Sequence, residues 1–380
     1  MECGFYRLIK KSSECKGRLG KIYTARGVVN TPIFMPVGTQ GTVKGVPMEW
    51  LRNSGAQIIL GNSYHLYLRP GTEIIKKAGG IQKFNSWNSP MLTDSGGFQI
   101  FSLSDIRKIS EEGSEFRSHI DGSKHFFSPE KSIQVQKDIG ADIIMCFDEC
   151  VPYPADYTSA KNSMELSLRW AKRCKAEFYK DNAHEIQALF GIIQGSVYND
   201  LRAKSTREML NIDFVGYAIG GLSVGEPKEY MRAVLENALP LIPENKARYL
   251  MGVGMPEDLW EGVERGVDMF DCVIPTRNGR NGQVFTSLGK INIRNAEYRE
   301  DFSPLDPECK CPACAGYTKA YLNHLVRAQE TLYLTLLSLH NIHFMVDLMA
   351  KIRKSLENDT FLKTKREFFE KYYSKNKRRG

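Results

Sequence analysis

The stretch SPEKSIQVQKDIGADIIMCFDE (residues 128–149) has the pattern of one helix followed by one buried strand. Ser128 is a typical N-cap, Pro129 suits the first turn of a helix, and Gly140 suits the position just after the last turn. The apolar run at 142–149 has no polar face, as in a parallel strand that is covered on both sides. The stretch therefore predicts one helix–strand unit of an α/β fold.

Seven further apolar segments of strand length occur along the chain. They are TPIFMPV (31–37), QIILGN (57–62), PMLTD (90–94), ALFGIIQG (188–195), GYAIGGLS (216–223), RYLMGVG (248–254) and MFDCVIP (269–275). Amphipathic stretches long enough for helices, such as residues 158–180, lie between them. Eight strands alternating with helices predict a (β/α)8 TIM barrel more than a doubly wound open sheet. No glycine-rich dinucleotide turn follows the first strand, which also argues against the open sheet.

The composition is that of a globular protein. The chain has 380 residues, of which 42% are hydrophobic and 25% charged, which fits one barrel-sized unit with an appendage. It has no run of roughly 18 apolar residues and no apolar core of a signal peptide near its start, so we expect no membrane span and a cytoplasmic location. Nine cysteines in a reducing compartment favour metal binding, chemistry or burial over disulfides.

The positive charge is concentrated at the C-terminus. The net charge is +8, and the segment from Lys351 to Gly380 holds eleven Lys and Arg residues against four Asp and Glu residues. This segment could be a solvated helix face with a basic tail, or it could contact a polyanion such as a nucleic acid. Charge alone does not separate the two readings.

Functional residues of a barrel lie at the carboxyl ends of its strands. Six of the eight apolar segments have polar residues or a glycine pair at that position. These are Asn62, Asp94, Asp148, Gln194, Gly220 with Gly221, and Asp271. Because they come from different segments but from equivalent positions, we predict that they share one pocket.

Two of these carboxylates suggest a reaction. Asp94 alone could be an ordinary N-cap of the next helix. Asp271 lies inside an apolar strand, between Phe270 and Cys272, where an unpaired carboxylate is costly. A pair of strand-end carboxylates is typical of displacement at a sugar carbon, in which one group attacks and the other moves the proton. Asp148 indicates a ligand with several N–H donors.

The segment after Asp271, residues 275–299, is basic and contains the sequence TRNGRNG. Its two Asn-Gly pairs favour tight turns, so we expect an exposed loop. A charged hairpin without function is one interpretation. Basic side chains beside a carboxylate pocket fit better with a substrate that carries phosphates around the reacting sugar.

Cys309, Cys311 and Cys314 indicate a metal site, because three thiolates so close together resemble most of a tetrahedral ligand set. The spacing does not choose the fourth ligand, and the candidates are His324, His340 and His343. Four protein ligands would make the site structural, whereas three ligands and a water would make it catalytic.

Nine segments in order resemble the tRNA-guanine transglycosylases, and most closely the bacterial members. They are TPIFMPVGTQGTVKG (31–45), GNSYHLYLRPG (61–71), LTDSGGFQ (92–99), FDEC (147–150), GIIQG (191–195), IGGLSVGE (219–226), YLMGVG (249–254), FDCVIPTRNGRNG (270–282) and CKCPAC (309–314). The resemblance implies an enzyme that exchanges guanine at the anticodon wobble position of the tRNAs for aspartate, asparagine, histidine and tyrosine. By the same resemblance, the incoming base would be a 7-deazaguanine and the RNA backbone would stay intact.

The resemblance also implies roles for residues that match the family motifs. Asp271 is then the nucleophile that forms a covalent glycosyl-enzyme, and Asp94 is the general acid and base. The base would be held by Asp148, Gln194, Gly221 and Leu222, and packed by Met251 and Phe98. Arg277 and Arg280 would contact the anticodon loop.

Other implied features concern the base, the metal and the assembly. Cys150 and Val224 would line the space beside the 7-substituent, with Glu226 nearby, so we expect 7-aminomethyl-7-deazaguanine rather than bulky queuine. His340 would complete a closed Cys3His set that holds one structural Zn2+ per subunit. The family further implies a homodimer.

We accordingly divide the chain into three parts: a catalytic barrel at 1–300 with an RNA-contacting loop at 275–299, a zinc-binding subdomain at 301–350, and a basic helix or tail at 351–380. Two alternatives remain. A non-catalytic RNA-binding homologue that supports a partner subunit should lack one of the two carboxylates, yet both are present. A zinc hydrolase should have its metal ligands at strand ends, but the cysteines lie well beyond the last strand.

Overall fold

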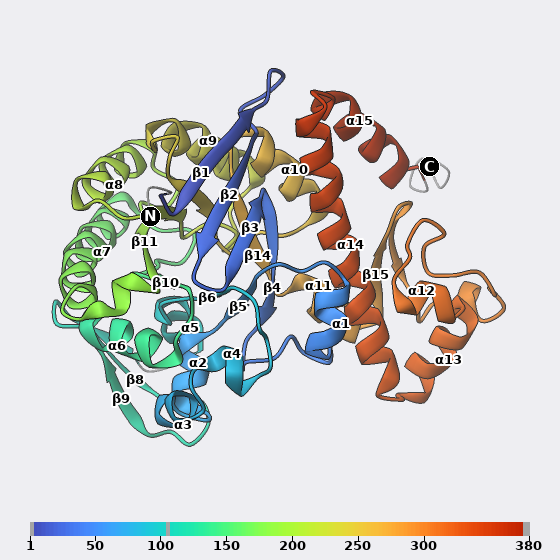
Figure 1. The fold of residues 1–380 in the computed structure, drawn as a ribbon, viewed down its shortest axis with the longest axis horizontal. Coiled ribbons are helices and arrows are strands. Elements are labelled where there is room, and N and C mark those ends of the chain that lie inside the picture. The colour runs from blue at the N-terminus through green and yellow to red at the C-terminus, as the bar shows by residue number, and fades with distance from the viewer. Residues whose placement is uncertain (1–3, 104–106, 375–380) are drawn as a thin grey trace.

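The computed structural model describes residues 4–103 and 107–374 (Figure 1). Its centre is a closed barrel of eight parallel strands, in which the last strand, β14, pairs with the first, β4. The barrel strands are β4 (Ile33–Gly38), β5 (Ile59–Gly61), β6 (Met91–Thr93), β10 (Ile143–Met145), β11 (Ala188–Ile193), β12 (Gly216–Ile219), β13 (Ala247–Leu250) and β14 (Met269–Cys272). Each predicted apolar segment overlaps one of these strands to within one residue at either end or contains it, so the predicted barrel is confirmed.

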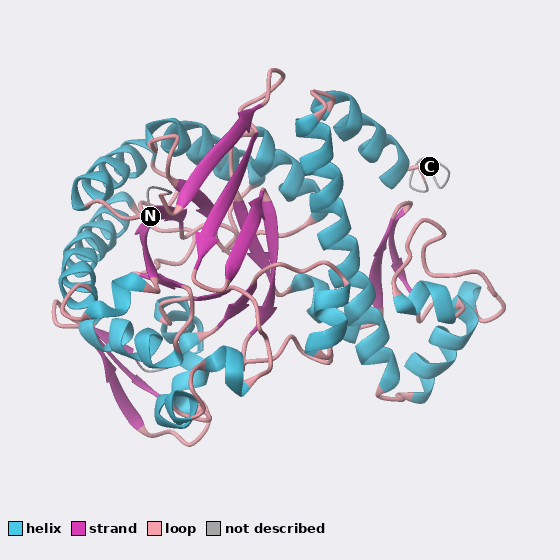
Figure 2. Ribbon diagram, in the orientation of Figure 1, coloured by secondary structure: helices cyan, strands magenta, loops and turns pink. Residues whose placement is uncertain are grey.

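Helices surround the barrel (Figure 2). They are α1 (Met48–Asn53), α2 (Ser63–Leu68), α3 (Thr72–Lys77), α4 (Ile81–Phe84), α5 (Gly97–Leu103), α6 (Pro129–Ile139), α7 (Tyr157–Phe178), α8 (Asn199–Ile212), α9 (Lys228–Ala238), α10 (Pro256–Glu264) and α11 (Ile274–Arg280), with short 3-10 turns at Asn182–Glu185, Leu239–Leu241 and Ala296–Tyr298. Helix α6 has the predicted ends: the Ser128 hydroxyl accepts from Lys131 N, and Gly140 is left-handed at φ 81°.

Two antiparallel sheets were not predicted. The first joins β1 (Tyr6–Lys11), β2 (Arg18–Thr24) and β3 (Gly27–Thr31), and the second joins β7 (Arg107–Ile109), β8 (Ser114–Arg117) and β9 (Lys124–Phe127). Tyr6, Ile22 and Val29 of the first sheet share one apolar cluster with side chains of the barrel strands. Arg18 also forms a buried ion pair of 2.5 Å with Asp268, the residue before β14. The first sheet therefore closes the amino-terminal end of the barrel.

The C-terminal part contains β15 (Gln283–Thr286), β16 (Gly289–Asn292), α12 (Pro312–Gly316), α13 (Lys319–Ala328), α14 (Leu332–Glu357) and α15 (Phe361–Tyr372). Helix α14 is long and apolar enough to cross a membrane by length and composition, although it has no unbroken apolar run. However, 61% of its most apolar window is buried inside the protein. In Figure 1 it stands between the barrel and the C-terminal elements, as the core helix that joins them.

The expectation that TRNGRNG forms an exposed loop is wrong for residues 276–280, which lie in α11. Pro275 occupies the first turn of this helix, where its missing N–H is not needed. Gly279 lies against α14 so closely that a Cβ would stand 2.7 Å from the backbone nitrogen of Ser338. Only the second Asn-Gly pair forms a turn, with Gly282 at φ 80° before the β15–β16 hairpin.

The hairpin and the cysteine segment share one apolar cluster, which includes Val284, Ile291, Leu305 and Leu336. Helix α14 continues without a break through residue 350. The division at 300 and 350 stays a prediction, and the last residues of its third part, 375–380, lie outside the described residues.

Candidate active site

Asp94 lies directly after β6 and is 8% exposed. Its Oδ2 accepts from Asn62 Nδ2 at 2.5 Å, and its Oδ1 accepts from the backbone N–H and the hydroxyl of Ser63 at 2.9 and 3.3 Å. Burial raises the pKa of Asp94 to about 7, against the bonds from Ser63, and the neighbouring Asp271 raises it further. A carboxyl group with a pKa near neutrality can both give and take a proton.

Asp271 lies in β14 and is equally buried. A single oxygen, Oδ1, accepts from the Tyr249 hydroxyl at 2.5 Å and from Gly252 N at 2.7 Å. Burial raises the pKa of Asp271, while these two bonds lower it. Burial and Asp271 also raise the pKa of Tyr249 well above its ordinary value, so Tyr249 stays a donor. The bonds turn Oδ1 toward the protein, and Oδ2 receives no hydrogen bond from the described residues.

Asp148 follows β10 and forms a second polar centre with Gln194, which follows β11. The Gln194 side chain donates to Asp148 Oδ2 at 2.7 Å, and the Ser95 hydroxyl donates to Oδ1 at 3.0 Å. Burial raises the pKa of Asp148 to about 6, although these bonds lower it. Asp148 can therefore present a carboxylate to the N–H groups of a ligand.

The backbone conformation and the close packing at position 221 require a glycine. Its φ is +64°, and a Cβ there would stand 2.5 Å from Gln194 Oε1. Glycine is the residue that adopts this backbone without strain. The backbone at the end of β12 can thus approach the Gln194 amide closely, as a base-binding edge needs.

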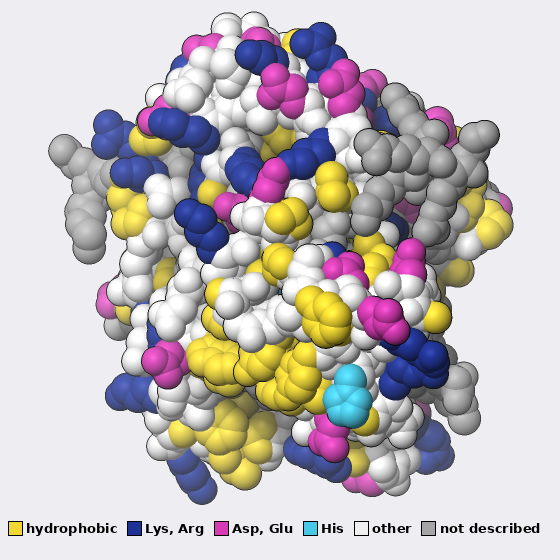
Figure 3. Space-filling model, turned by 90° about the vertical axis from the view of Figure 1, so that its right-hand side faces the viewer, with side chains coloured by type: hydrophobic (Ala, Val, Ile, Leu, Met, Phe, Trp, Pro, Cys, Tyr) yellow, Lys and Arg dark blue, Asp and Glu magenta, His cyan; other side chains and the backbone are white. Residues whose placement is uncertain are grey.

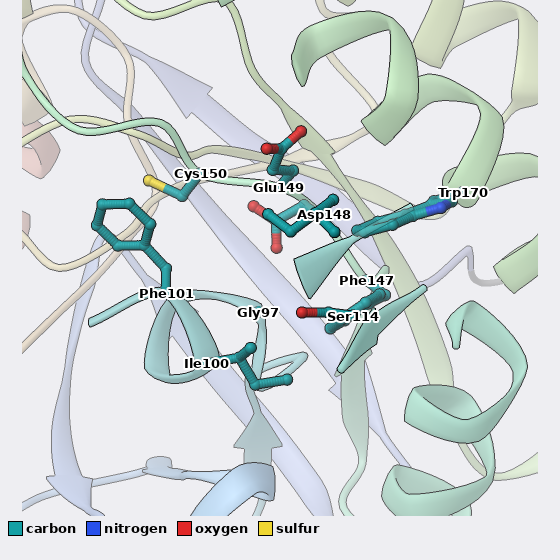
Figure 4. A pocket seen from close by; sticks show the side chains of 10 residues that line it. Gly97, Ile100, Phe101, Ser114, Phe147, Asp148, Glu149, Cys150 and Trp170 are labelled. Carbon is teal, nitrogen blue, oxygen red and sulfur yellow. The ribbon is translucent and has the colours of Figure 1, made fainter. Parts of the chain in front are cut away.

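A small cavity borders Asp148 on its β10 side (Figure 4). It is lined by Gly97, Ile100, Phe101, Ile109, Ser114, Phe147, Asp148, Glu149, Cys150 and Trp170. In Figure 4, side chains of α5 lie on one side and residues 148–150 on the other. Neither Asp94 nor Asp271 lines it, so this cavity adjoins the Cys150 side of the site and not the carboxylate pair.

The other predicted base contacts also come from strand ends, with different exposure. Leu222 and Cys150 are buried, and Met251 and Val224 are half-buried. Phe98 is the second residue of α5 and is 46% exposed. Packing of Met251 and Phe98 against a base remains a prediction.

Arg277 and Arg280 lie on α11, just after β14; Arg277 is exposed and Arg280 half-buried. Burial lowers the pKa of Lys44, and Arg280 and Arg277 lower it further, so the three cations lie near one another. Lys44 follows β4 at the same end of the barrel. Lys44 was not singled out from the sequence, although it lies in the segment 31–45 that resembles a family motif.

Sequence reasoning also missed Tyr249 and Ser63, which hold the two carboxylates. Tyr249 occurs in an otherwise apolar strand, and a buried tyrosine hydroxyl usually has a partner. That signal predicts a hydrogen bond but does not identify its acceptor.

Cys309, Cys311, Cys314 and His340 come together, with their candidate ligand atoms all within 4.8 Å of one another. His340 Nδ1 lies 3.6, 3.5 and 3.3 Å from the three sulfurs in that order. Tetrahedral zinc with Zn–S of about 2.3 Å and Zn–N of about 2.0 Å places sulfur and nitrogen about 3.5 Å apart. His340 Nε2 lies 2.7 Å from Phe285 O, so it donates there and Nδ1 is left for a metal. The donor set fits zinc.

The chain is similar to curated proteins along nearly its whole length. The family model described as "Queuine tRNA-ribosyltransferase" matches residues 13–374. Proteins with the same description include one from Thermoanaerobacter sp. (strain X514), 59% identical over 367 residues that make up 97% of each chain. Another, from Caldanaerobacter subterraneus subsp. tengcongensis, is 58% identical over 368 residues and also 97% of each chain. A third, from Halothermothrix orenii, is 57% identical over 370 residues, 97% of this chain and 98% of the relative.

Proposed function

Since the chain belongs to the queuine tRNA-ribosyltransferase family and is thus a tRNA-guanine transglycosylase, we propose that Asp271 and Asp94 carry its reaction. The observation behind this proposal is the difference between the two buried carboxylates. Asp271 has one oxygen held by two donors, whereas Asp94 has a pKa of about 7. One group suits attack on carbon and the other suits proton transfer.

In the first half of the reaction, an oxygen of Asp271 attacks C1′ of the ribose while the C1′–N9 bond to guanine breaks. Protonated Asp94 gives its proton to the departing guanine, which is a poor leaving group as an anion. The products are a glycosyl ester of Asp271, free guanine and ionised Asp94. Tyr249 and Gly252 keep the Asp271 carboxylate oriented for this attack.

In the second half, ionised Asp94 takes the N9 proton of the incoming base. N9 then attacks C1′ and the ester bond to Asp271 breaks, which restores both carboxyl groups. Two inversions return the original anomer, as in retaining glycosidases. The RNA backbone is not cut at any step.

Base recognition is assigned to Asp148, Gln194 and the backbone of Gly221 and Leu222. A guanine-like edge offers N–H donors to the Asp148 carboxylate. Gln194 is oriented by its bond to Asp148, which supports a fixed hydrogen-bond pattern at the pocket wall. The target base would have to leave the anticodon stack to reach this buried wall.

We assign 7-aminomethyl-7-deazaguanine as the incoming base, although the relatives are named for queuine. Cys150, which is buried, and Val224, which is half-buried, would form the wall beside the 7-substituent. The Glu226 carboxylate accepts from Ser223 N and Val224 N at 2.5 and 2.9 Å, which holds an acidic group at this wall. Exchange assays with each base in turn test the assignment: a preference for queuine would contradict it.

The RNA partner is the anticodon loop of the tRNAs for aspartate, asparagine, histidine and tyrosine. Arg277, Arg280 and Lys44 form a basic group beside the carboxylate pocket, which suits phosphates on either side of the target nucleotide. A cytoplasmic location without membrane attachment belongs to the same proposal.

Zinc, one ion per subunit, would be held by Cys309, Cys311, Cys314 and His340. Bound there, zinc would link the cysteine segment to α14 through four protein ligands. The Phe285 carbonyl fixes the orientation of His340, and no described residue of the base pocket belongs to this cluster.

A homodimer is the proposed assembly, as the family resemblance implies. Tyr317 lies just before α13 and Tyr321 lies on it, and their rings stack with centroids 5.5 Å apart. Phe302 is 74% exposed. Apolar side chains gather on the face of the molecule that carries α12 and α13 (Figure 3). A second copy would cover this face, and light scattering of the wild-type protein and of Tyr321→Glu tests it, with a monomeric wild type as the contradicting result.

The decisive experiment for the reaction is exchange of labelled guanine into unmodified tRNA. Wild-type protein should exchange guanine and form a covalent tRNA adduct that survives denaturing electrophoresis. Asp271→Ala should do neither. Exchange by Asp271→Ala would refute the nucleophile assignment, and tRNA binding without exchange by the wild type would favour the non-catalytic alternative.

A further inference from the structure

Arg202 of α8 is a buried cation that the proposed reaction does not use. It is 0% exposed, and its guanidinium group donates to backbone carbonyl oxygens only. Nε donates to Ser196 O at 2.7 Å, one terminal nitrogen to Ile193 O at 2.7 Å, and the other to Gly221 O at 3.4 Å. Among the described residues, no carboxylate forms a hydrogen bond or an ion pair with it. Such a buried charge is costly and is rarely kept without a role.

The three carbonyl groups belong to the ends of two neighbouring barrel strands. Ile193 ends β11, Ser196 lies three residues later, and Gly221 follows β12. A guanidinium group is planar and rigid, so three bonds to it fix the positions of its acceptors relative to one another. Arg202 therefore sets how the end of β11 lies against the end of β12.

Gln194 lies between these fixed points. Its backbone N–H donates to the Ser205 hydroxyl of α8 at 3.2 Å, and its side chain reaches Asp148. A Cβ on Gly220 would stand 2.8 Å from Gln194 Nε2, so the amide already lies against the β12 backbone. A small movement of either strand end would move the amide or open this contact.

The charge of Arg202 faces the same wall. Burial lowers the pKa of Arg202 to about 10, while Cys150 and Glu226 raise it, so the side chain is protonated at neutral pH. Cys150 and Glu226 flank the space expected for the 7-substituent. Arg202 therefore lies behind the wall that is expected to bind the base.

We propose that Arg202 is a positioning residue for the base: it holds the ends of β11 and β12 so that Gln194 and the Gly221–Leu222 backbone meet the base edge. The inference rests on the proposed function, since it assumes that this wall binds the exchanged base. It predicts weaker binding of the free base, with the contacts to tRNA and the attack by Asp271 little affected.

The test compares Arg202→Lys and Arg202→Met with Arg248→Lys. Lysine keeps the charge but cannot reach three carbonyls, and methionine removes both charge and donors. Arg248 is a matched control, because it is also buried and also donates to a backbone carbonyl, Ile242 O at 2.6 Å. It neighbours Asp268, at the opposite end of the barrel. Each protein is assayed for guanine exchange with the base and then the tRNA as the varied substrate.

Arg202→Lys should raise the KM of the base about tenfold or more, because hydrogen bonds from a charged donor are lost. Its KM for tRNA and its kcat at saturating base should stay within about twofold of wild type, and Arg202→Met should show the larger change. A wild type without exchange would overturn the proposed function itself. An active wild type with an unchanged base KM in Arg202→Lys would overturn this inference alone. Equal changes in both KM values, or two Arg202 variants that fail to fold while Arg248→Lys folds, would make Arg202 a folding residue and would also overturn it.

Discussion

Two aspartates of equal burial acquire different properties from their neighbours. Asp271 accepts from a tyrosine hydroxyl and a backbone N–H, both on one oxygen. Asp94 accepts from Asn62 and Ser63 on both oxygens, yet its pKa still rises to about 7 because it is buried and near a second carboxyl group. The proposed division of labour between the two groups therefore rests on their positions and not on residue type.

Asp94→Asn should change how stability depends on pH. The folded-state pKa of about 7 exceeds the ordinary value of 3.8, so the folded state binds more protons between these values and wild-type stability falls as pH rises through them. Asparagine has no such ionisation. The variant should therefore gain stability relative to wild type from pH 4 to 7, by roughly 4 kcal/mol at most. Urea unfolding at pH 4.5 and 8 measures this, and a difference independent of pH would contradict it.

Gly221→Ala should damage base binding through Gln194. The added Cβ would meet Gln194 Oε1 at 2.5 Å, so the amide must move. Gly225→Ala is the matched control, since its φ of +118° also makes alanine strained but its Cβ would meet nothing within 4 Å. We expect the KM of the base to rise about tenfold or more in Gly221→Ala alone. Similar kinetics for both variants would mean that backbone strain, and not contact with Gln194, is the cause.

The sequence predicts which strand ends carry functional residues, but not how each is held. The polar positions Asp94, Asp148 and Gln194 follow from apolar runs that end in polar residues. Their partners are Ser63, at the start of α2, and Ser95, in the loop after β6, and a serine at such a place has many possible acceptors. A pattern along one chain cannot select among them, because the selection depends on how separate segments of the chain meet.

At the scale of elements, α11 shows why a turn signal can fail. Asn-Gly pairs favour tight turns, but the first pair of TRNGRNG lies in a helix packed on α14. The glycine is needed for close approach of two backbones and not for a turn. Helical geometry places Arg277 and Arg280 less than one turn apart, on an element that a buried helix supports.

Gly279→Ala tests that packing. Its Cβ would stand 2.7 to 2.9 Å from backbone atoms of Leu337 and Ser338, which cannot move like a side-chain end. Overpacking of this kind costs about 1–3 kcal/mol, more than the gain in helix propensity. Gly316→Ala, at the end of α12 with nothing within 4 Å, should be close to neutral. Thermal unfolding of the two variants measures the difference, and an equally stable Gly279→Ala would contradict the packing argument.

Across the whole molecule, the positive C-terminal helix is partly neutralised by ion pairs. Lys365 pairs with Glu261 and Glu264 at 2.9 and 2.7 Å, and Lys371 pairs with Glu308. Helix α10 ends at Glu264, just before β14 begins, so α15 lies toward the amino-terminal end of the barrel, away from the carboxylate pair. For the described part of this segment, the reading as a solvated helix face is favoured over direct contact with the target RNA loop.

Cys311→Ser should affect folding before chemistry. Cys311 is 1% exposed and lies in the apolar cluster of the C-terminal elements. Loss of one ligand should remove most of the zinc and lower the thermal stability, because binding energy at such a site is folding energy. Zinc content and thermal unfolding measure both effects. Full zinc loss with an unchanged unfolding temperature and no exchange activity would instead favour a catalytic metal.

The barrel could be predicted because its strands are covered on both faces and are therefore apolar throughout. The two small antiparallel sheets could not. Strands such as YRLIKK (β1) and KHFF (β9) alternate exposed residues with mostly half-buried ones and bury one residue each, so their sequences also suit surface loops. The sequence did not identify α14 as a core helix, because polar residues such as His340 and Asn341 interrupt its apolar run. Both of these residues are nevertheless buried.

Those two neighbouring residues of α14 tie separate parts of the protein together. His340 belongs to the cysteine cluster, while the Asn341 side chain donates to Pro275 O and Gln283 O, both at 2.9 Å, and accepts from Phe285 N at 3.0 Å. Pro275 lies in the first turn of α11, the helix that carries Arg277 and Arg280. If the proposed zinc site and the proposed anticodon contacts of this helix both hold, modification of the wobble base would depend on the zinc supply of the cell, although zinc takes no part in the exchange.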